Sequence, residues 1–224
     1  MALLDASQHK IVSDAVAQAE LTTSGEIVPV LTDASDNYAE VVLAYCAAIA
    51  FTAMSVMAAF PMVFTGLWDG LWGGWGHDWT TGEFTTLMLG LGVVSFAATW
   101  AILLIDALKF RLVPGPLKRA RVRDAAVRHF KVGAESRTHG RTGVMLYLSM
   151  KEHRAEIVAD SAIAELVPAE VWGEAMADML SEVRKGCLAE GIAAGVRDVG
   201  KVLSPHFPRA EDDINELPDR LIEL

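Results

Sequence analysis

The chain has 224 residues, of which 52% are hydrophobic, with a mean hydropathy of +0.31 and a formal net charge of −10. This composition is too apolar for an ordinary soluble domain, so a membrane-embedded segment is expected. The acidic balance excludes nucleic acid as a partner, because a nucleic-acid binder needs a basic face to neutralise phosphates. The two cysteines, Cys46 and Cys187, have no metal-ligand spacing.

The first 40 residues predict the first part of a small domain. Asp5 is suited to cap a helix over residues 5–21. The stretch "GEIVPVLTD", residues 25–33, predicts a β-strand. Pro29 has no N–H to donate, so this strand is expected at a sheet edge, or with Pro29 at a position that needs no ladder bond. No basic region followed by an apolar one opens the chain, so no signal peptide is expected.

An apolar hairpin is predicted over residues 41–108, with spans at 41–64 and 84–108. Residues 41–64 and 84–105 carry no charged side chain. Each stretch exceeds the roughly 20 apolar residues that cross a bilayer. A pair of buried core helices is the alternative, but such helices usually carry a polar stripe.

The distribution of charge predicts the orientation of this hairpin. The link at residues 65–83 has no Lys or Arg, whereas residues 106–123 have six. Positive charge stays on the cytoplasmic side, so we expect a multi-pass protein of the bacterial inner membrane with both termini cytoplasmic. The link is rich in tryptophan, which suits a membrane–water interface, although a ligand-stacking cluster is the alternative. The predicted interface residues are Trp68, Trp72, Trp75, Trp79, Lys109, Arg111, Lys118 and Arg119.

Residues 109–204 predict the second part of the domain, followed by an acidic tail at 205–224 that is either an ordered strap or a loose end. The expected helices and strands alternate in type, which indicates an α/β fold: a small mixed sheet flanked by helices and interrupted by the two-helix transmembrane hairpin. The first two strands should be parallel, through a right-handed crossover. The predicted elements are helices at 114–131, 167–185 and 188–203 and strands at 142–150 and 154–162.

Two sequence blocks carry a resemblance to a known family. They are "TTSGEIVPVLTD", residues 22–33, and "RTGVMLYLSMKEHRAEIVAD", residues 141–160, the second followed by two helices that end near "GIAAGVRDVGKVL". Together they resemble the TPM-domain family, which includes the thylakoid acid phosphatase. The closing "NELPDRLIEL", residues 215–224, is similar to a bacterial membrane branch in which a transmembrane hairpin splits the domain.

The resemblance implies a small α/β domain attached to the membrane. In the plant branch it also implies acid phosphatase activity and a role in photosystem repair. Many members have a Gly-Tyr-Gly-Leu-Glu-like turn after the last hairpin strand, where this chain reads "ADSAIAELV", residues 159–167, without glycine. Phosphatase activity is therefore not carried over. The sequence also has no Cys-x5-Arg loop, DxD pair, P-loop or HExxH motif.

Acidic residues gather at the predicted carboxyl ends of the parallel strands, where open α/β sheets tend to bind ligands. They are Asp33, Asp36 and Glu152. Hard cations take several carboxylate oxygens, so a Ca²⁺ or Mg²⁺ site is one hypothesis, and solvated loop acids are the alternative. The hairpin leaves from this edge of the sheet, which favours a head-group or partner contact there.

The opposite edge holds a second candidate cluster, made of Glu26, Arg141 and Asp160. The planar guanidinium of Arg141 could pair with both carboxylates. A structural ion-pair cluster is one interpretation. A functional site is the other, in which Arg141 holds an anion and the carboxylates hold a metal or activate water.

These features favour an integral membrane protein whose cytoplasmic domain acts as a binding or assembly module. The expected partners are the lipid bilayer and either another membrane protein or a second copy of the chain. The alternative function is a membrane-tethered, divalent-metal-dependent acid phosphatase-like hydrolase, so whether the protein is an enzyme stays open. Two spans without a buried charge pair do not make a transport pathway unless the protein oligomerises.

Overall fold

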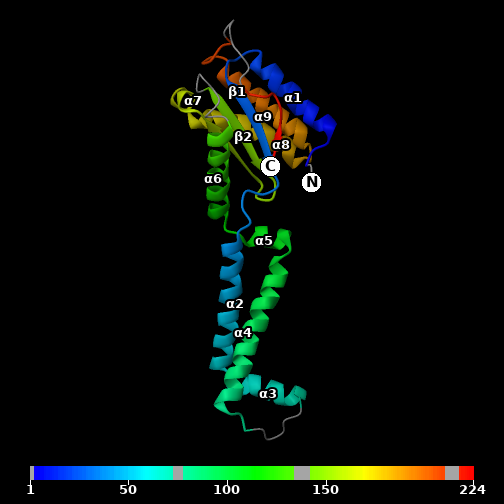
Figure 1. Cartoon of the computed structure of the whole chain (residues 1–224), viewed down its shortest axis with the longest axis vertical. Coiled ribbons are helices and arrows are strands. Elements are labelled where there is room, and N and C mark those ends of the chain that lie inside the picture. The colour runs from blue at the N-terminus through cyan, green and yellow to red at the C-terminus, as the bar shows by residue number, and fades with distance from the viewer. Residues whose placement is uncertain (1–2, 73–77, 134–141, 210–216) are drawn as a thin grey trace. The chain divides into compact units, whose positions relative to one another are not determined.

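A computed structural model describes residues 3–72, 78–133, 142–209 and 217–224 of the chain (Figure 1). The chain divides into two compact units. Unit 1 consists of Met1–Asp36 and Gly115–Leu224, and unit 2 of Asn37–Pro114. A domain interrupted by an inserted segment is therefore what the structure has, and the boundaries lie a few residues from the predicted ones.

One mixed sheet forms the centre of unit 1. Within the described residues it has four strands, in the order β3-β2-β1-β4. The first two strands are parallel neighbours with Glu26 opposite Gly143, β3 pairs antiparallel with β2, and β4 pairs parallel with β1. The α/β class and the mixed sheet are thus confirmed. The strands are β1, Glu26–Thr32; β2, Gly143–Ser149; β3, Arg154–Ala159; and β4, Ile222–Glu223.

Strand β1 is internal to the sheet, so its predicted edge position is wrong. The tail of the chain supplies the extra strand, since β4 pairs with Val30 and Leu31. Alternate residues of a parallel strand direct their backbone groups to opposite neighbours. Leu31 accepts from the N–H of Leu224 on the β4 side, and Pro29, two residues earlier, faces that same side before β4 begins. This agrees with the other expectation, that Pro29 lies where no ladder bond is needed.

Helices cover both faces of the sheet (Figure 1). On one face, Ile27, Leu31 and Leu146 form a core with buried residues of the helix before β1 and of the helices after β3. On the other face Val28, Met145 and Tyr147 pack against the helix that precedes β2. This alternation follows from the two-residue period of a strand. The first face carries α1, Ala6–Glu20; α7, Ser161–Leu166; α8, Ala169–Arg184; and α9, Leu188–Leu203; the second carries α6, Gly115–Gly133.

Local sequence explains how the helices begin and pack. Asp5 caps α1 as predicted, with its side chain accepting from the N–H of Gln8 and the Gln8 side chain accepting from the N–H of Asp5. A Cβ placed at Gly200 of α9 would lie 2.8 Å from the Cβ of Ala19 in α1, so only glycine permits this close approach. Helix α7 lies where no helix was predicted, between β3 and α8.

Unit 2 is a helical hairpin with two shorter helices. In the described residues, α2 and α4 are long and apolar enough to cross a membrane, by length and composition. They pack together, and a Cβ at Gly92 of α4 would lie 2.7 Å from Sδ of Met54 in α2. The helices are α2, Ala39–Ala59; α3, Pro61–Trp72; α4, Thr81–Leu103; and α5, Asp106–Leu112.

The predicted ends of both spans are too long. The first was expected to continue to residue 64, but it ends at Ala59 because Pro61 has no N–H for the preceding turn. Pro61 instead opens α3, where a missing donor costs nothing. The second span ends at Leu103 rather than residue 108, and α5 follows after a bend.

The two ends of unit 2 lie close together within that unit. The rings of Tyr38, before α2, and Phe110, in α5, meet edge to face at 5.6 Å between centroids. The hydroxyl of Tyr45 donates to the carbonyl of Leu112 at 3.1 Å. The chain therefore enters and leaves this unit at one place.

Candidate functional site

Two buried carboxylates lie at the edge of the sheet where β1 and β2 begin. Glu26 and Asp160 are 5% and 4% exposed. Glu26 Oε2 accepts from the N–H of Leu217 at 3.2 Å, and Asp160 Oδ2 accepts from the N–H of Gly143 at 3.0 Å. Glu26 and Gly143 are opposite one another in the ladder, so both acids belong to the same end of the sheet. Arg141 lies outside the described residues, and its pairing with them stays a prediction.

A third acid at this end, Glu20, was not predicted. Its Oε1 accepts from the N–H of Ile27 at 2.9 Å, on the β4 side of β1 but before the residues that β4 pairs with. Burial raises the pKa of Glu20 to about 8, and the neighbouring carboxylates of Glu26 and Asp219 add to the rise, although the bond from Ile27 opposes it. Glu20 is therefore largely protonated at neutral pH. Nothing in the sequence indicated this, because a glutamate at the end of an amphipathic helix is usually a surface residue.

The acids predicted at the other end of the strands each contact groups of the protein. Asp33 Oδ2 lies 2.6 Å from Nζ of Lys151, and Asp36 Oδ2 lies 3.2 Å from Nε of Arg121. Glu152 is 3% exposed and accepts from the N–H of Ser35 at 2.9 Å and from the hydroxyl of Ser149.

These contacts account for the three acids without a metal ion. In the part of the chain that the structure describes, no three His, Cys, Asp or Glu side chains are grouped so that they could hold a metal. The Ca²⁺ or Mg²⁺ site on Asp33, Asp36 and Glu152 therefore stays a prediction. Their clearest role is structural, because Asp36 ties the end of the first chain segment to α6.

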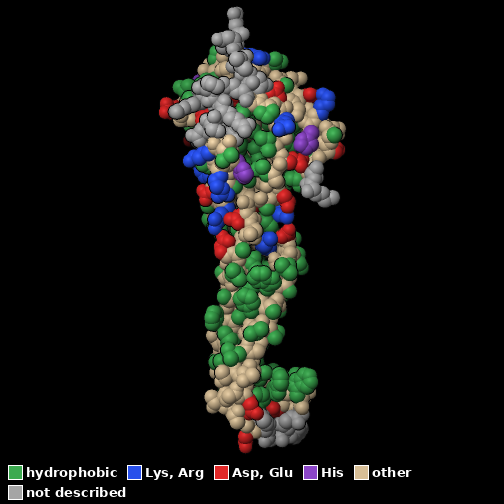
Figure 2. Space-filling view, in the orientation of Figure 1, with side chains coloured by type: hydrophobic (Ala, Val, Ile, Leu, Met, Phe, Trp, Pro, Cys, Tyr) green, Lys and Arg blue, Asp and Glu red, His purple; other side chains and the backbone are tan. Residues whose placement is uncertain are grey.

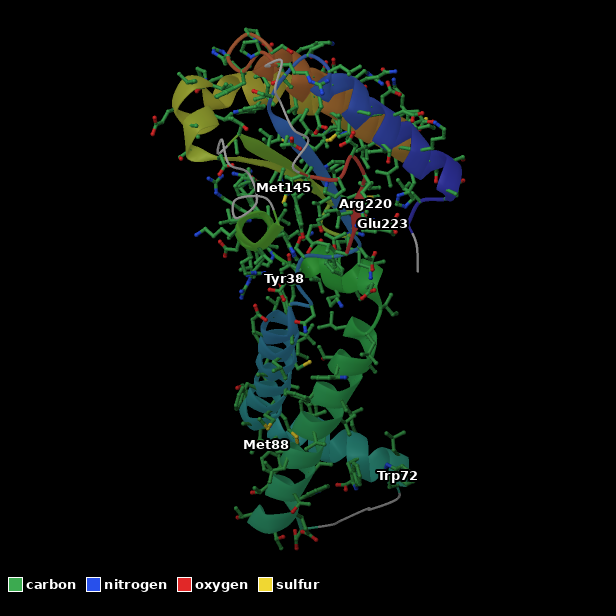
Figure 3. All side chains as sticks on the ribbon, turned by 45° about the horizontal axis from the view of Figure 1, so that its top comes forward. Tyr38, Trp72, Met88, Met145, Arg220 and Glu223 are labelled. Atoms are coloured by element: carbon green, nitrogen blue, oxygen red, sulfur yellow. The ribbon has the colours of Figure 1, made fainter. Side chains whose placement is uncertain are left out.

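The predicted interface tryptophans lie in and beside α3. Trp68 and Trp72 are neighbours on that helix, 6.0 Å apart between ring centroids, and 44% and 76% exposed. The indole N–H of Trp79 donates to Asp69 Oδ2 at 3.2 Å. Trp75 lies outside the described residues. Figure 3 labels Trp72 at the end of α3.

An apolar pocket of about 1060 Å³ adjoins these rings inside unit 2. Leucines from α3 and α4 form much of its wall, and Asp69 and Glu83 are its acidic members. The sequence indicated the tryptophans but not the pocket, because α3 was expected to be a loop.

The predicted basic residues follow α4. Lys109 pairs with Asp106 of the same short helix at 2.8 Å, and Arg111 is exposed. Lys118 and Arg119 lie in the first turns of α6, where Arg119 is exposed and Lys118 half-buried. Thus α5 and the start of α6 carry positive charge, as the orientation argument requires.

Comparisons with known proteins agree with this fold. Residues 112–202 match the family model TPM_phosphatase, described as the TPM domain. The BA42 protein of the psychrophilic bacterium Bizionia argentinensis, solved by NMR, is similar in structure with a TM-score of 0.52 and 18% identity, covering 100% of this chain and 97% of that one. At this identity the likeness shows the fold alone. No curated protein matches the sequence. The family match spans α6 to α9 with β2 and β3, so this part of unit 1 is similar to the TPM domain.

Proposed function

We propose that the protein is anchored in the bacterial inner membrane by unit 2 and that unit 1 acts as a binding or assembly module on the cytoplasmic side. One observation carries the anchoring: the apolar pair α2 and α4 is inserted between β1 and β2, which are adjacent parallel strands. The chain leaves unit 1 at Asp36 and returns at Gly115, and Asp36 contacts Arg121 in α6. Both connections to the inserted unit therefore lie close together in unit 1.

The surface of unit 2 supports a lipid environment. Large apolar side chains on α2, α3 and α4 are exposed, and in Figure 2 Lys, Arg, Asp and Glu colours are absent along the middle of α2 and α4. A soluble protein rarely leaves so much contiguous apolar surface open. The most exposed of these residues are Phe51 (66%), Met62 (86%), Leu71 (78%), Trp72 (76%), Val93 (69%) and Val94 (65%).

The positions of the basic residues support the cytoplasmic placement of unit 1. Lys109 and Arg111 follow the second span at once, while residues 65–83 have no Lys or Arg. The positive-inside rule places the basic side in the cytoplasm. The tryptophans of α3 then lie at the outer interface.

Alkaline extraction and cysteine labelling test this arrangement. Cys187 in unit 1 is exposed and Cys46 in α2 is buried, so the native chain offers one accessible thiol. A membrane-impermeant maleimide should label Cys187 only after spheroplasts are permeabilised. In a Cys187→Ser background, a cysteine at Asp78 should be labelled in intact spheroplasts. Release by alkaline carbonate, or labelling of Cys187 in intact spheroplasts, would contradict the proposal.

The second candidate function is a membrane-tethered, divalent-metal-dependent phosphatase-like hydrolase. The name of the matched family model and the buried acids at the start of β1 and β2 favour it. The purified full chain should then hydrolyse a generic phosphoester with Ca²⁺ or Mg²⁺, and Asp160→Asn should abolish turnover. A binding module instead predicts no turnover and a stoichiometric partner in a mild-detergent pull-down. The two outcomes separate the two functions.

A further inference from the structure

We infer that Arg119, Arg123 and Arg154 form a binding site for the phosphate of an anionic lipid head group. These residues are called the arginine cluster below. The inference rests on the proposed membrane anchoring and adds a partner for a defined surface of unit 1. In Figure 2 Lys and Arg side chains gather, among Asp and Glu, along the part of unit 1 that α6 occupies in Figure 1.

Tertiary structure brings the three side chains together from two elements. Arg119 and Arg123 are four residues apart, and so share one side of α6. Arg154 begins β3, and a Cβ at Gly115, the first residue of α6, would lie 3.9 Å from its Nη2. The cluster is thus formed between a helix and a strand that are neighbours in unit 1.

One carboxylate, Glu156, lies among these arginines. Glu156 Oε2 is 3.8 Å from Nη1 of Arg123, and all three arginines act on its charge. Burial nevertheless raises the pKa of Glu156, against the lowering by Arg123, Arg119 and Arg154. Among the described residues, one half-buried carboxylate offsets only one of the three guanidinium charges, so this part of the surface keeps an excess of positive charge.

The arginine cluster is exposed enough to bind a ligand. The Arg123 side chain is 71% exposed while that of Glu156 is 20% exposed, so the guanidinium is accessible to a ligand from solvent. Guanidinium groups bind phosphate oxygens in pairs through their planar N–H donors. Two or three guanidinium groups can therefore donate hydrogen bonds to the oxygens of one phosphate.

Chain connectivity is what selects a lipid as the source of the phosphate. Gly115 directly follows Pro114, the last residue of the hairpin unit. Basic residues that follow a membrane span closely in sequence are typical binding sites for anionic head groups, because each Lys or Arg near the surface strengthens association by about fivefold.

The test is lipid retention by the full chain. Protein purified in uncharged detergent is titrated with short-chain phosphatidylglycerol or phosphatidylcholine, and occupancy is measured by native mass spectrometry. The variant Arg119→Gln/Arg123→Gln/Arg154→Gln should bind phosphatidylglycerol roughly tenfold or more weakly than the native chain. The matched control, Lys10→Gln/Lys185→Gln/Lys201→Gln, removes three exposed charges from the helices on the other face of the sheet and should bind like the native chain.

A second measurement needs no variant. Hydrogen exchange of the native chain in nanodiscs should show stronger protection of residues 115–133 and 154–159 when phosphatidylglycerol replaces phosphatidylcholine. Equal binding of both lipids, equal loss in both triple variants, or unchanged exchange would overturn the inference. Complete displacement of phosphatidylglycerol by an equal concentration of inorganic phosphate would also overturn it, because the site would then take free phosphate.

Failure of this inference and failure of the anchoring give different results. If the arginine variant still resists alkaline extraction but lipid binding is unaffected, only the lipid site is wrong. If the native chain itself is released by alkali, the anchoring is wrong and the lipid site loses its basis.

Discussion

Glu223 Oε1 accepts a hydrogen bond from the backbone N–H of Leu4 at 3.0 Å, so the last strand of the chain holds the segment before its first helix. Oε2 accepts from the N–H of Leu3 at 3.0 Å, and Nε2 of His9 lies 3.0 Å from Oε1. Figure 3 labels Glu223 beside Arg220 on this closing segment. The acidic tail is therefore a strap in its last residues, which the sequence left undecided.

Replacing Glu223 should weaken this strap. Glu223→Ala removes the two carboxylate oxygens that contact Leu3, Leu4 and His9. It should lower the free energy of unfolding of unit 1 by about 2 kcal/mol at pH 7. Thermal unfolding of the full chain in detergent, followed by circular dichroism, measures the loss. Glu165→Ala changes an exposed glutamate of α7 and should leave the unfolding temperature unchanged; an equal effect of both variants would refute the strap.

The strap should also weaken in acid. Burial tends to raise the pKa of Glu223, but the hydrogen bonds from Leu3, Leu4 and His9 outweigh it and hold the pKa below its usual value of 4.5. A lowered carboxyl pKa stabilises the fold above the unfolded-state value, and this contribution is lost as the pH falls through the folded-state value. The difference in unfolding temperature between native chain and Glu223→Ala should thus shrink below about pH 4. A difference that grows in acid would contradict this assignment.

Glu20 predicts the opposite dependence on pH. Its pKa is raised to about 8 in the fold, mainly by burial. The folded state therefore holds a proton that the unfolded state loses above the usual glutamate pKa of 4.5. Stability from this group is full in acid and is lost as the pH rises toward 8. Glu20→Gln keeps an oxygen for the N–H of Ile27 without the charge. After allowance for partial exposure it should stabilise unit 1 by about 1 to 2 kcal/mol at pH 8.5, and much less at pH 5.

The control for Glu20→Gln is Glu165→Gln, which removes an exposed charge. It should change the free energy of unfolding only slightly, and by the same amount at pH 5 and pH 8.5. Chemical unfolding of the full chain at pH 5 and 8.5 gives the comparison. A Glu20→Gln variant that is less stable than the native chain at pH 8.5 would show that the carboxylate is charged and bound in the fold.

The packing of the hairpin predicts a contrast between two glycines of α4. A side chain at Gly92 would meet Sδ of Met54 at 2.7 Å, whereas one at Gly90 has no heavy atom within 4 Å. Gly92→Val should therefore displace the flexible Met54 side chain from the contact between α2 and α4 and lower stability by about 1 kcal/mol. Gly90→Val makes the same change on an open position of the same helix and should be tolerated. Thermal aggregation of the detergent-solubilised proteins compares them, and equal tolerance would refute the close packing at Gly92.

Removal of the hairpin unit tests whether it is a true insertion. Replacing residues 37–114 by a short Gly/Ser linker between Asp36 and Gly115 should leave a soluble, folded unit 1, because β1 and β2 are adjacent and Asp36 contacts α6. Circular dichroism and a cooperative unfolding transition without detergent would show it. An insoluble or non-cooperative product would mean that unit 2 is needed for the sheet to form.

The sequence alone determined the local elements and their general order. Apolar runs in 25–33 and 142–150, the alternation in 154–162 and helical periodicity elsewhere reflect which side chains each element must bury. The structure has these strands and most of these helices. The two long apolar helices could also be predicted, because a run of uncharged residues is visible in the local sequence. Helix α3 was missed because Gly and Trp in the link indicate a loop, while Pro61 is suited to begin a helix.

Only the tertiary structure decided which distant groups meet. Strand β4 and the strap of Glu223 depend on pairing across most of the chain, for which two residues of strand give no local pattern. In the sequence Glu20 and Glu156 resemble ordinary surface acids, and only tertiary packing buries their carboxyl groups and raises their pKa. Three acids of the predicted sites, Glu26, Glu152 and Asp160, are buried in the structure. The sequence did not indicate which groups they contact. Periodicity is encoded residue by residue, whereas burial and charge pairing depend on surfaces that exist only once the sheet and helices have assembled.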